Sequence, residues 1–495
     1  SRRPAAGEIP GYPRRMENFD LYKALLYFQD PVFENWKRYV GNFLNHVNVH
    51  TGFAVKDEPA LISLTLVNEG NIHKKWDADP LSRKCALKEF GQWLGTRGEA
   101  AEDRARRSLL FDRFLTEVYQ RRHRQMVEYV RSLGCVKPLS DQNMGCSPQL
   151  SSMRMSYDFV ENHLYYNHPE FAGPSWGLPS YTRNDSVLKL HAEVPAWLFP
   201  SRIYGKPFLV TEFDFARPNP HRADGALLFG VYGALQQWDG LFQFAYTHGL
   251  EKIKYSRRTD AYFDLATDPV KLLSQYLGTA FFRNGELEHS RNDACAVVLP
   301  SGRFIRNEEL NPPEYGRIGL CRMLGTAATP DRAFRMLPGT RPELRAFLKK
   351  LVPDGCYRAA GGAVVLDPSR RVFRAVSPQA EAFILPAGTQ EKGRFCRVKN
   401  RIGDAVFGII SVDRKPLAES KRMLLLHLTD TAATKQRYSD QDHRCLEDWG
   451  TIPFLAARGE ADLTLVPENG KTYRLYAVDT SGRRLEEIPF KKFSG

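Results

Sequence analysis

The sequence predicts an α/β fold with parallel strands in the first half of the chain and an antiparallel β-sandwich in the second half. Residues 60–71, ALISLTLVNEGN, form a nearly continuous apolar run, which is typical of a strand buried on both faces of a parallel sheet. Residues 206–215, KPFLVTEFDF, have the same character after a Gly-Lys-Pro turn. Beyond residue 283 the chain changes to short β-type runs separated by turns, as in a sandwich.

Both apolar runs end in polar residues. Asn68 and Glu69 close the first run, and Glu212 lies near the end of the second. The carboxyl ends of parallel strands meet at one edge of the sheet, where α/β barrels place their active sites, so we expect both glutamates at one site. Asp158, Glu161 and Asp214 are rivals for the catalytic role, and Asp214 is the first of them, because strand alternation turns it to the same side as Glu212. The other interpretation of the two glutamates is a pair of solvated loop acids.

Two carboxyl groups at one site suit the cleavage of a glycosidic bond. One group protonates the leaving oxygen, and the other attacks the sugar or activates water. The protonating group needs a raised pKa, which a partly apolar setting and the charge of the other carboxylate would give it. A separation of about 5–5.5 Å between the groups would retain the anomeric configuration, and about 6.5–9.5 Å would invert it.

Helices and strands alternate through the first part of the chain. Residues 1–30 are rich in Pro, Gly and Arg and predict a loop. Apolar residues at helical spacing predict helices over 31–46, 81–94, 104–133, 224–236 and 269–282. Further strands are expected over 135–140, 157–164 and 240–248. The arginines of the 104–133 helix fall largely outside its apolar stripe, which favours a solvated face over a phosphate site.

Other polar and aromatic residues lie near the predicted strand ends. Asn143 follows the 135–140 strand, His163 and Tyr165 close the next one, and Tyr246 belongs to the end of the last. Asn143 is alternatively an ordinary loop residue, and His163 a structural histidine. Because pyranose CH faces stack on aromatic rings, Trp176, Trp238 and Tyr246 are candidate sugar platforms. Ordinary packing is the alternative for each ring.

The second part of the chain reads as β-rich. Short strands are expected over 294–299, 363–366, 405–412, 422–428, 461–466 and 473–478, with a helix over 341–351. The chain of 495 residues is too long for one ordinary domain. We therefore divide it into residues 1–283, a catalytic barrel, and residues 284–495, a C-terminal β-rich part.

The composition limits the kinds of partner that we expect the protein to bind. The net charge is +13, but Lys and Arg are interleaved with Asp and Glu, which favours an ordinary basic surface over nucleic-acid binding. No apolar run reaches the roughly 20 residues of a membrane span. The eight cysteines show no CxxC or His-paired spacing, so neither a metal site, a cofactor nor a disulfide framework is expected. The chain shows no signal peptide; secretion or a periplasmic location stays open.

The ordered set Asn68-Glu69, His163-x-Tyr165 and Glu212 resembles the retaining glycoside hydrolases of clan A, (β/α)8 barrels that include families 5 and 42. In that clan the fourth strand ends in Asn-Glu and the seventh in the nucleophilic glutamate. The resemblance implies that Glu69 is the acid/base, Glu212 the nucleophile and Asn68 a ligand of the sugar 2-hydroxyl. Tyr165 would donate a hydrogen bond to the nucleophile.

The resemblance implies a retaining β-glycosidase that hydrolyses an oligosaccharide or polysaccharide by double displacement. The substrate-binding residues would then be Asn68, Asn143, His163, Tyr165, Trp176 and Tyr246. Two alternatives stay open: a non-catalytic carbohydrate-binding relic of such a barrel, and a basic polyanion-binding protein.

The chain departs from the clan A pattern in the number of strands that precede residues 60–71. If residues 60–71 form the fourth strand, only about sixty residues precede it, with one clear helix and no clear strand. Three βα units need roughly thirty residues or more each. The expected (β/α)8 barrel is therefore N-terminally incomplete, with strands four to eight only. The missing segment would come from another chain or from upstream sequence.

Overall fold

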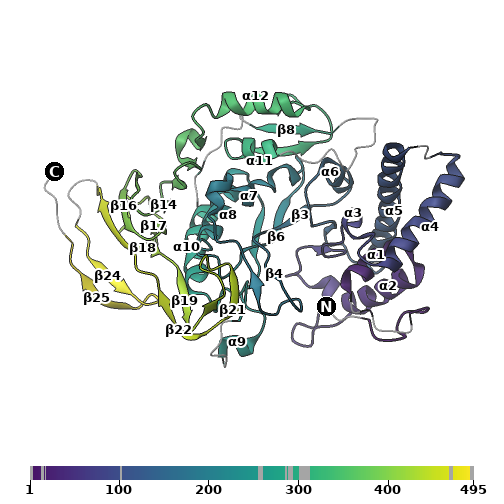
Figure 1. Ribbon diagram of the computed structural model, residues 1–495, viewed down its shortest axis with the longest axis horizontal. Coiled ribbons are helices and arrows are strands. Elements are labelled where there is room, and N and C mark those ends of the chain that lie inside the picture. Colours follow the sequence, from purple (N-terminus) through teal and green to yellow (C-terminus); the bar gives the residue numbers. More distant parts are fainter. Residues whose placement is uncertain are drawn as a thin grey trace.

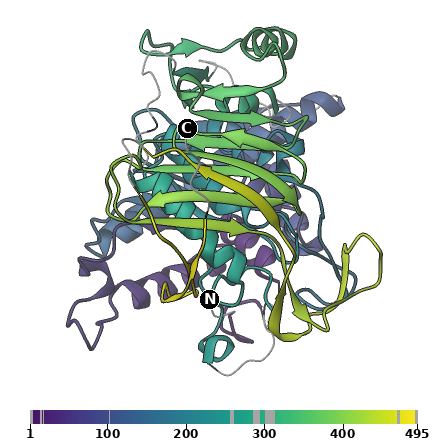
Figure 2. The same cartoon turned by 90° about the vertical axis from the view of Figure 1, so that its left-hand side faces the viewer.

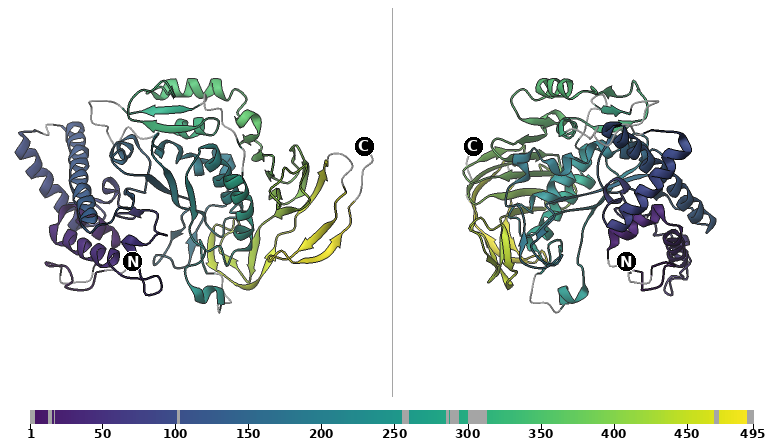
Figure 3. Two further views of the ribbon diagram at one scale, coloured as in Figure 1. Left: turned by 180° about the vertical axis from the view of Figure 1, so that it is seen from behind. Right: turned by 45° about the vertical axis from the view of Figure 1, so that its right-hand side comes forward.

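The computed structural model describes residues 4–12, 16, 18–100, 103–254, 260–284, 287, 294–299, 313–467 and 472–490. Three parts follow one another along the long axis of the molecule (Figure 1). N-terminal helices lie at one end, a parallel sheet with its helices lies in the middle, and antiparallel strands lie at the other end. The view from behind shows the same order (Figure 3).

The parallel strands of the middle part follow chain order. β1 (Leu64–Thr65) pairs with β2 (Leu139–Ser140), and β3 (Val160–Tyr166) pairs with β6 (Phe208–Phe215), which pairs with β7 (Gly240–Gln243). A parallel bridge from Met144 to His163 and a hydrogen bond of 2.9 Å from His163 N–H to the Asn143 carbonyl join the chain after β2 to β3. The order β1-β2-β3-β6-β7 agrees with the predicted parallel strands.

Within the described ranges the sheet does not close into a barrel. The strand neighbours are β2 for β1 and β6 for β7, so each of these two strands has an outer edge without a paired strand in the described part of the chain. The expectation that a further segment completes the barrel stays a prediction, and an additional strand can pair with either edge.

Most predicted helices agree with the structure to within a few residues. They are α2 (Asp30–Leu44), α4 (Pro80–Arg97), α5 (Arg104–Ser132), α8 (Asp224–Leu235), α10 (Pro269–Asn284) and α12 (Arg341–Leu351). Short helices lie between them: α3 (Ile72–Lys75), α6 (Pro148–Arg154), α7 (Glu193–Ala196), α9 (Leu250–Lys254) and α11 (Pro313–Gly319). No helix in the described ranges is both long and apolar enough to cross a lipid bilayer.

Two N-terminal predictions are wrong. Residues 19–28 were expected in a loop but form α1 (Phe19–Phe28), whose first turn is capped by the side chain of Asn18. The helix is held by burial of Leu25, Leu26 and Tyr27, a tertiary effect that the flanking Pro and Gly residues conceal. The predicted 60–71 strand shrinks to β1, and the chain beyond it turns at Glu69, which has a positive φ of 51°.

The helices α1, α2, α4 and α5 bury Trp36, Phe90 and Phe114 in one core, which also includes Leu66 after β1 and Leu139 of β2. The expected solvated face of α5 has an exception: the Arg122 side chain is 4% exposed and pairs with Asp30 at 2.9 Å.

The C-terminal part contains antiparallel sheets, as predicted. One sheet has the order β11-β12-β13-β14-β17-β18, and a second has the order β15-β16-β23. Their strands are β11 (Tyr357–Ala359), β12 (Val364–Asp367), β13 (Val372–Val376), β14 (Ala380–Leu385), β15 (Gln390–Lys392), β16 (Cys396–Ile402), β17 (Ala405–Ser411), β18 (Met423–Leu428) and β23 (Glu460–Leu465). Phe383, Phe407 and Val398 of the two sheets pack in one core, as in a sandwich.

Residues 294–299 do not join this antiparallel arrangement. β8 (Cys295–Val298) pairs in parallel with both β9 (Leu324–Ala327) and β10 (Arg335–Met336). Together with α11 and α12, these strands form a small α/β unit (Figure 1, top). The prediction failed here because a short apolar run looks the same in a parallel and an antiparallel sheet.

The larger antiparallel sheet lies across helices of the middle part, as Figure 2 shows. The rings of Tyr232 on α8 and Phe373 on β13 lie 5.9 Å apart, and a Cβ on Gly408 of β17 would lie 2.2 Å from Leu277 of α10. One core cluster thus contains residues from both sides of position 283, such as Phe208 and Val406. The division at residue 283 remains a prediction about domains.

Late strands also reach back to the parallel sheet. β20 (Arg437–Tyr438) and β21 (Cys445–Asp448) extend the hairpin of β4 (Glu170–Phe171) and β5 (Ser180–Tyr181), which follows β3. The remaining strands are β19 (Thr431–Thr434), β22 (Thr451–Ala456), β24 (Leu475–Val478) and β25 (Arg484–Ile488).

Candidate active site

The turn after β1 presents Glu69. Its positive φ is a strained conformation for a residue other than glycine. Asn143, which follows β2, holds this turn: its Oδ1 accepts a hydrogen bond of 2.6 Å from the Glu69 N–H, and its Nδ2 donates at 3.1 Å to Asn68 Oδ1. Asn143 therefore positions the Asn68-Glu69 pair, a role more specific than that of a loop residue.

A β-bulge in β6 presents Glu212. Asn162 of β3 is paired with Val210 and His163 with Glu212, so Thr211 is an extra residue in β6. Neighbours in a regular strand point to opposite faces, whereas Thr211 and Glu212 both reach side chains of β3. Thr211 Oγ1 lies 3.1 Å from His163 Nε2, and Tyr165 donates to Glu212 Oε2 at 2.5 Å.

His163 lies between the two glutamates. Its Nδ1 is 3.2 Å from Glu69 Oε1 and 3.4 Å from Glu212 Oε2. One oxygen of each carboxylate lies within 4.8 Å of the other. The two carboxylates are 28% and 21% exposed while His163 is 3% exposed, so a ligand can reach the acids and not the ring. The structure thus brings together Asn68, Glu69, Asn143, His163, Tyr165 and Glu212.

The electrostatics of Glu69 differ from the sequence expectation. The hydrogen bond with His163 holds the pKa of Glu69 below its usual range, and burial opposes this only in part. The expected raised pKa is therefore wrong for the protein without ligand. Burial, followed by the hydrogen bond to Glu212, raises the pKa of Tyr165, so this phenol keeps its proton and remains a donor.

Asp214 is not a competitor for the role of Glu212. Its side chain is fully buried, forms an ion pair with Lys271 and accepts a hydrogen bond of 2.6 Å from Gln243. Burial raises the pKa of Asp214 to about 7. A substrate cannot reach this carboxyl group.

The three aromatic candidates for sugar platforms differ in their exposure and in their distance from the site. Trp176 is 57% exposed, and its ring lies 5.2 Å from that of His168, which lies 6.3 Å from Tyr165. Trp176 is therefore at the rim of the same site. Tyr246 follows β7 and is 62% exposed. Trp238 is buried against Phe199 and Phe208, so its interpretation as a platform is wrong.

The group Glu69, His163 and Glu212 also has ligand atoms close enough to hold a metal ion. However, His163 Nδ1 faces both carboxylates at hydrogen-bonding distance, and a nitrogen that donates a proton has no lone pair for a metal. We assign no metal to these residues.

Sequence reasoning missed two groups that shape the site, Thr211 and Lys23, and it named a third, Glu161, as a rival catalytic acid rather than as a link between strands. Thr211 lies inside an apolar strand, and only the bulge turns it toward His163. Glu161, which is buried, accepts hydrogen bonds from Thr211 and Thr65 and so links β3 to β6 and β1. Lys23 lies on α1, a segment predicted as a loop. No signal in the sequence distinguishes Thr211 or Lys23.

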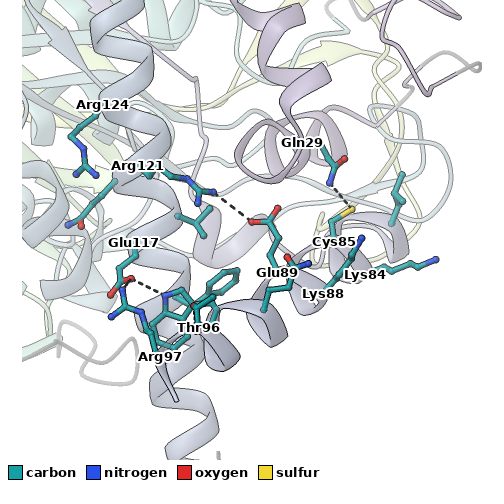
Figure 4. Close-up of a pocket in the computed structure, with 16 residues that line it drawn as sticks. Gln29, Lys84, Cys85, Lys88, Glu89, Thr96, Arg97, Glu117, Arg121 and Arg124 are labelled. Carbon is teal, nitrogen blue, oxygen red and sulfur yellow. Dashed lines mark hydrogen bonds and ion pairs between the residues drawn. The ribbon is translucent and has the colours of Figure 1, made fainter. Parts of the chain in front are cut away.

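A large groove lies elsewhere, between α4 and α5 (Figure 4). Its volume is about 850 Å³, and neither Glu69 nor Glu212 lines it. Its cations alternate with carboxylates: Arg97 pairs with Glu117 at 2.7 Å, and Arg121 with Glu89 at 3.7 Å. This mixed lining does not favour the polyanion-binding alternative.

No protein-family model matches the chain, and no curated protein sequence matches it. Several solved structures are similar to the chain. The endo-β-1,4-mannanase of Thermotoga petrophila is 16% identical, with a TM-score of 0.31 over 56% of this chain and 57% of that one. A glycoside hydrolase family 5 mannosidase of Rhizomucor miehei is 12% identical, with a TM-score of 0.31 over 52% and 61%.

A β-galactosidase of the haloarchaeon Halorubrum lacusprofundi is 14% identical, with a TM-score of 0.37 over 81% of this chain and 67% of that one. The chain spans little more than half of the Thermotoga mannanase. Scores at this level carry no argument about activity, so the function proposed for this chain rests on its own site.

Proposed function

We propose that the protein is a retaining β-glycosidase that hydrolyses O-glycosidic bonds of an oligosaccharide or polysaccharide. The observation that supports this most is the approach of Glu69 and Glu212, with carboxylate oxygens within 4.8 Å across His163. An oxygen–oxygen distance below this limit is compatible with the separation of about 5–5.5 Å used for double displacement and is shorter than the roughly 6.5–9.5 Å of an inverting enzyme.

In the proposed mechanism Glu212 attacks the anomeric carbon while Glu69 protonates the leaving oxygen. Glu69 then takes a proton from the water that hydrolyses the glycosyl-enzyme. Tyr165, which donates to Glu212 Oε2, orients the nucleophile. Because the free Glu69 has a lowered pKa, we propose that the bound sugar shields its carboxyl group from water and raises that pKa.

The substrate contacts in this proposal come from exposed groups at the same edge of the sheet. Asn68 binds the sugar 2-hydroxyl, while Trp176 and Tyr246 provide faces for pyranose rings. Asn143 and His163 act by holding Asn68 and Glu69 rather than by contact with sugar. The proposed partner is thus a carbohydrate, and the absence of a nucleic-acid or membrane partner stays a prediction.

The non-catalytic alternative would be favoured by glutamates more than about 9.5 Å apart, since neither double displacement nor water activation spans such a gap. The carboxylate oxygens lie far closer than this. We therefore prefer the glycosidase over the non-catalytic carbohydrate-binding protein.

The test uses Glu69→Ala and Glu212→Ala with 4-nitrophenyl β-D-glucoside, β-D-galactoside and β-D-mannoside. Each variant should lose at least about 100-fold in kcat on any glycoside that the unmodified protein hydrolyses. Glu34→Ala, at a glutamate 63% exposed on α2, is the control and should keep full activity.

Azide distinguishes the two roles. With Glu69→Ala it should replace water at the glycosyl-enzyme and give a β-glycosyl azide, and with Glu212→Ala it should attack the substrate and give the α-azide. Unimpaired hydrolysis by either variant would contradict the proposal.

A further inference from the structure

Helix α1 is fixed over the turn that carries Glu69. The Tyr27 hydroxyl donates at 3.2 Å to the carbonyl of Gly70, the residue after Glu69. At the other end of the helix, Lys75 Nζ donates at 2.7 Å to Asp20 Oδ2. Asp20, Lys23 and Tyr27 have spacings of three and four residues and so share one helix face. Lys23 therefore lies between two anchors on the face that meets the active-site turn, where α1 and α3 adjoin (Figure 1).

The ammonium group of Lys23 has no strong partner in the described residues. Its nearest carboxylate oxygen is Asp20 Oδ1 at 3.9 Å, beyond hydrogen-bonding distance, and Asp20 is already held by Lys75. The Lys23 side chain is only 18% exposed. Burial lowers the pKa of Lys23, and the carboxylates of Glu69, Asp20 and Glu212 act on its charge. A poorly hydrated cation with free N–H donors thus lies near both proposed catalytic acids.

On the α1 side of the site Lys23 and Lys75 face one carboxylate, Asp20, and the carboxylates of Glu69 and Glu212 also act on the charge of Lys23. A neutral sugar would leave Lys23 without a charged hydrogen-bond acceptor in the described residues. A carboxylate or sulfate would supply one, with charge-assisted hydrogen bonds. The charges of Glu69 and Glu212 disfavour an anion between them, so the anionic group belongs on the side of Lys23 next to Lys75.

We propose that Lys23 forms a subsite for the anionic substituent of an acidic sugar, beside Glu69 and Glu212. This inference rests on the proposed glycosidase function and names the substrate class. The recognised group is a ring carboxylate, as in a uronic acid, or a sulfate ester.

The first experiment compares matched substrates: 4-nitrophenyl β-D-glucuronide, its neutral glucoside, and the glucoside 6-sulfate, together with the galacto pair of uronide and neutral sugar. We expect kcat/KM to favour an anionic member at least tenfold over its neutral partner. A preference for the uronide identifies the carboxylate, and a preference for the 6-sulfate identifies the sulfate. Hydrolysis of neutral glycosides without an anionic preference overturns the inference but leaves the glycosidase proposal intact.

The second experiment uses Lys23→Met. The anionic-to-neutral ratio of kcat/KM should fall at least tenfold, and Lys23→Arg should keep most of it. If Lys23 acts only on the catalytic carboxylates, both substrates will slow by the same factor and the ratio will not change, which overturns the inference. Lys84→Met, at an exposed lysine of α4, should leave the ratio unchanged.

Binding supplies a readout that does not depend on hydrolysis. Titration calorimetry with D-glucuronate, D-glucose and D-glucose 6-sulfate should show tighter binding of an anionic sugar to the unmodified protein, and loss of this difference in Lys23→Met. Equal binding of all three sugars contradicts the anionic subsite whether or not the protein is an enzyme.

Discussion

At the scale of single residues, the state of Glu69 depends on two neighbours. Asn143 fixes the backbone of the turn, and His163 binds the carboxylate. The sequence was sufficient to predict which acids form the pair, because a carboxylate at the end of an apolar run can be recognised from the sequence alone. It did not predict that the pKa of Glu69 is lowered, because that depends on which hydrogen-bond donor lies opposite.

The pH profile of kcat/KM tests this control of Glu69. The hydrogen bond from His163 lowers the pKa of Glu69, so the free enzyme should lose its catalytic proton at a lower pH than an ordinary glutamic acid would. Substituting His163→Ala removes the donor, the pKa of Glu69 rises, and the alkaline limb of kcat/KM should move to higher pH. The measurement is kcat/KM on an aryl glycoside from about pH 3 to about pH 9.

Tyr165→Phe is the matched control for this profile. It removes the hydrogen bond to Glu212 and should reduce kcat about tenfold or more. The alkaline limb of kcat/KM should stay at the same pH. If the alkaline limb of kcat/KM stays at the same pH in His163→Ala, then His163 does not set the pKa of Glu69.

At the scale of elements, local irregularities decide what faces the site. The bulge at Thr211 turns two successive residues of β6 toward β3, and the turn that presents Glu69 follows a β1 of only two residues. Helices with regular apolar spacing, such as α5 and α12, were predicted closely because burial on one face leaves a clear period. Neither the bulge nor the helix α1 leaves such a pattern.

The crossing of α8 and α10 depends on glycine. A Cβ on Gly278 would lie 2.4 Å from the Ala226 carbonyl oxygen, and one on Gly230 would lie 2.3 Å from the Gly278 carbonyl oxygen. Gly278→Ala should therefore force the helices apart and lower the free energy of unfolding by about 1–3 kcal/mol. Urea denaturation followed by circular dichroism measures this loss.

Gly91→Ala is the control for the helix crossing. This glycine lies inside α4 with open space around its Cβ position, so alanine should raise the free energy of unfolding by about 0.5–1 kcal/mol. Equal effects of Gly91→Ala and Gly278→Ala would contradict the close packing.

At the scale of the whole molecule, the antiparallel sheets and the parallel sheet share one core. The sequence predicted both types of sheet from their turns and apolar runs. It predicted neither the packing of β13 and β17 on α8 and α10 nor the parallel unit of β8, β9 and β10, because contacts between distant segments leave no periodic trace. No strand of the described residues pairs with the outer edges of β1 and β7, and the completion of a barrel by a further segment stays a prediction.

Arg222 joins these parts. Its guanidinium, 0% exposed, donates to Asp268 and Asp430 at 2.5 Å each and to the Thr431 carbonyl at 2.9 Å. Arg222→Ala leaves the buried Asp268 without its partner and should lower the free energy of unfolding by about 3–5 kcal/mol. Arg458→Ala removes a side chain that is 78% exposed and should change it by less than about 0.5 kcal/mol. Similar losses in both variants would contradict the role of Arg222.

The central claim, that Glu69 and Glu212 act as a double-displacement pair, is tested most directly by trapping the glycosyl-enzyme. The protein is incubated with 2,4-dinitrophenyl 2-deoxy-2-fluoro-β-D-glycosides of the gluco, galacto and manno series, digested and analysed by mass spectrometry. We predict that one fluorosugar is attached to the peptide containing Glu212, and that Glu212→Gln prevents this attachment. Attachment of a fluorosugar to a residue other than Glu212 would contradict the claim.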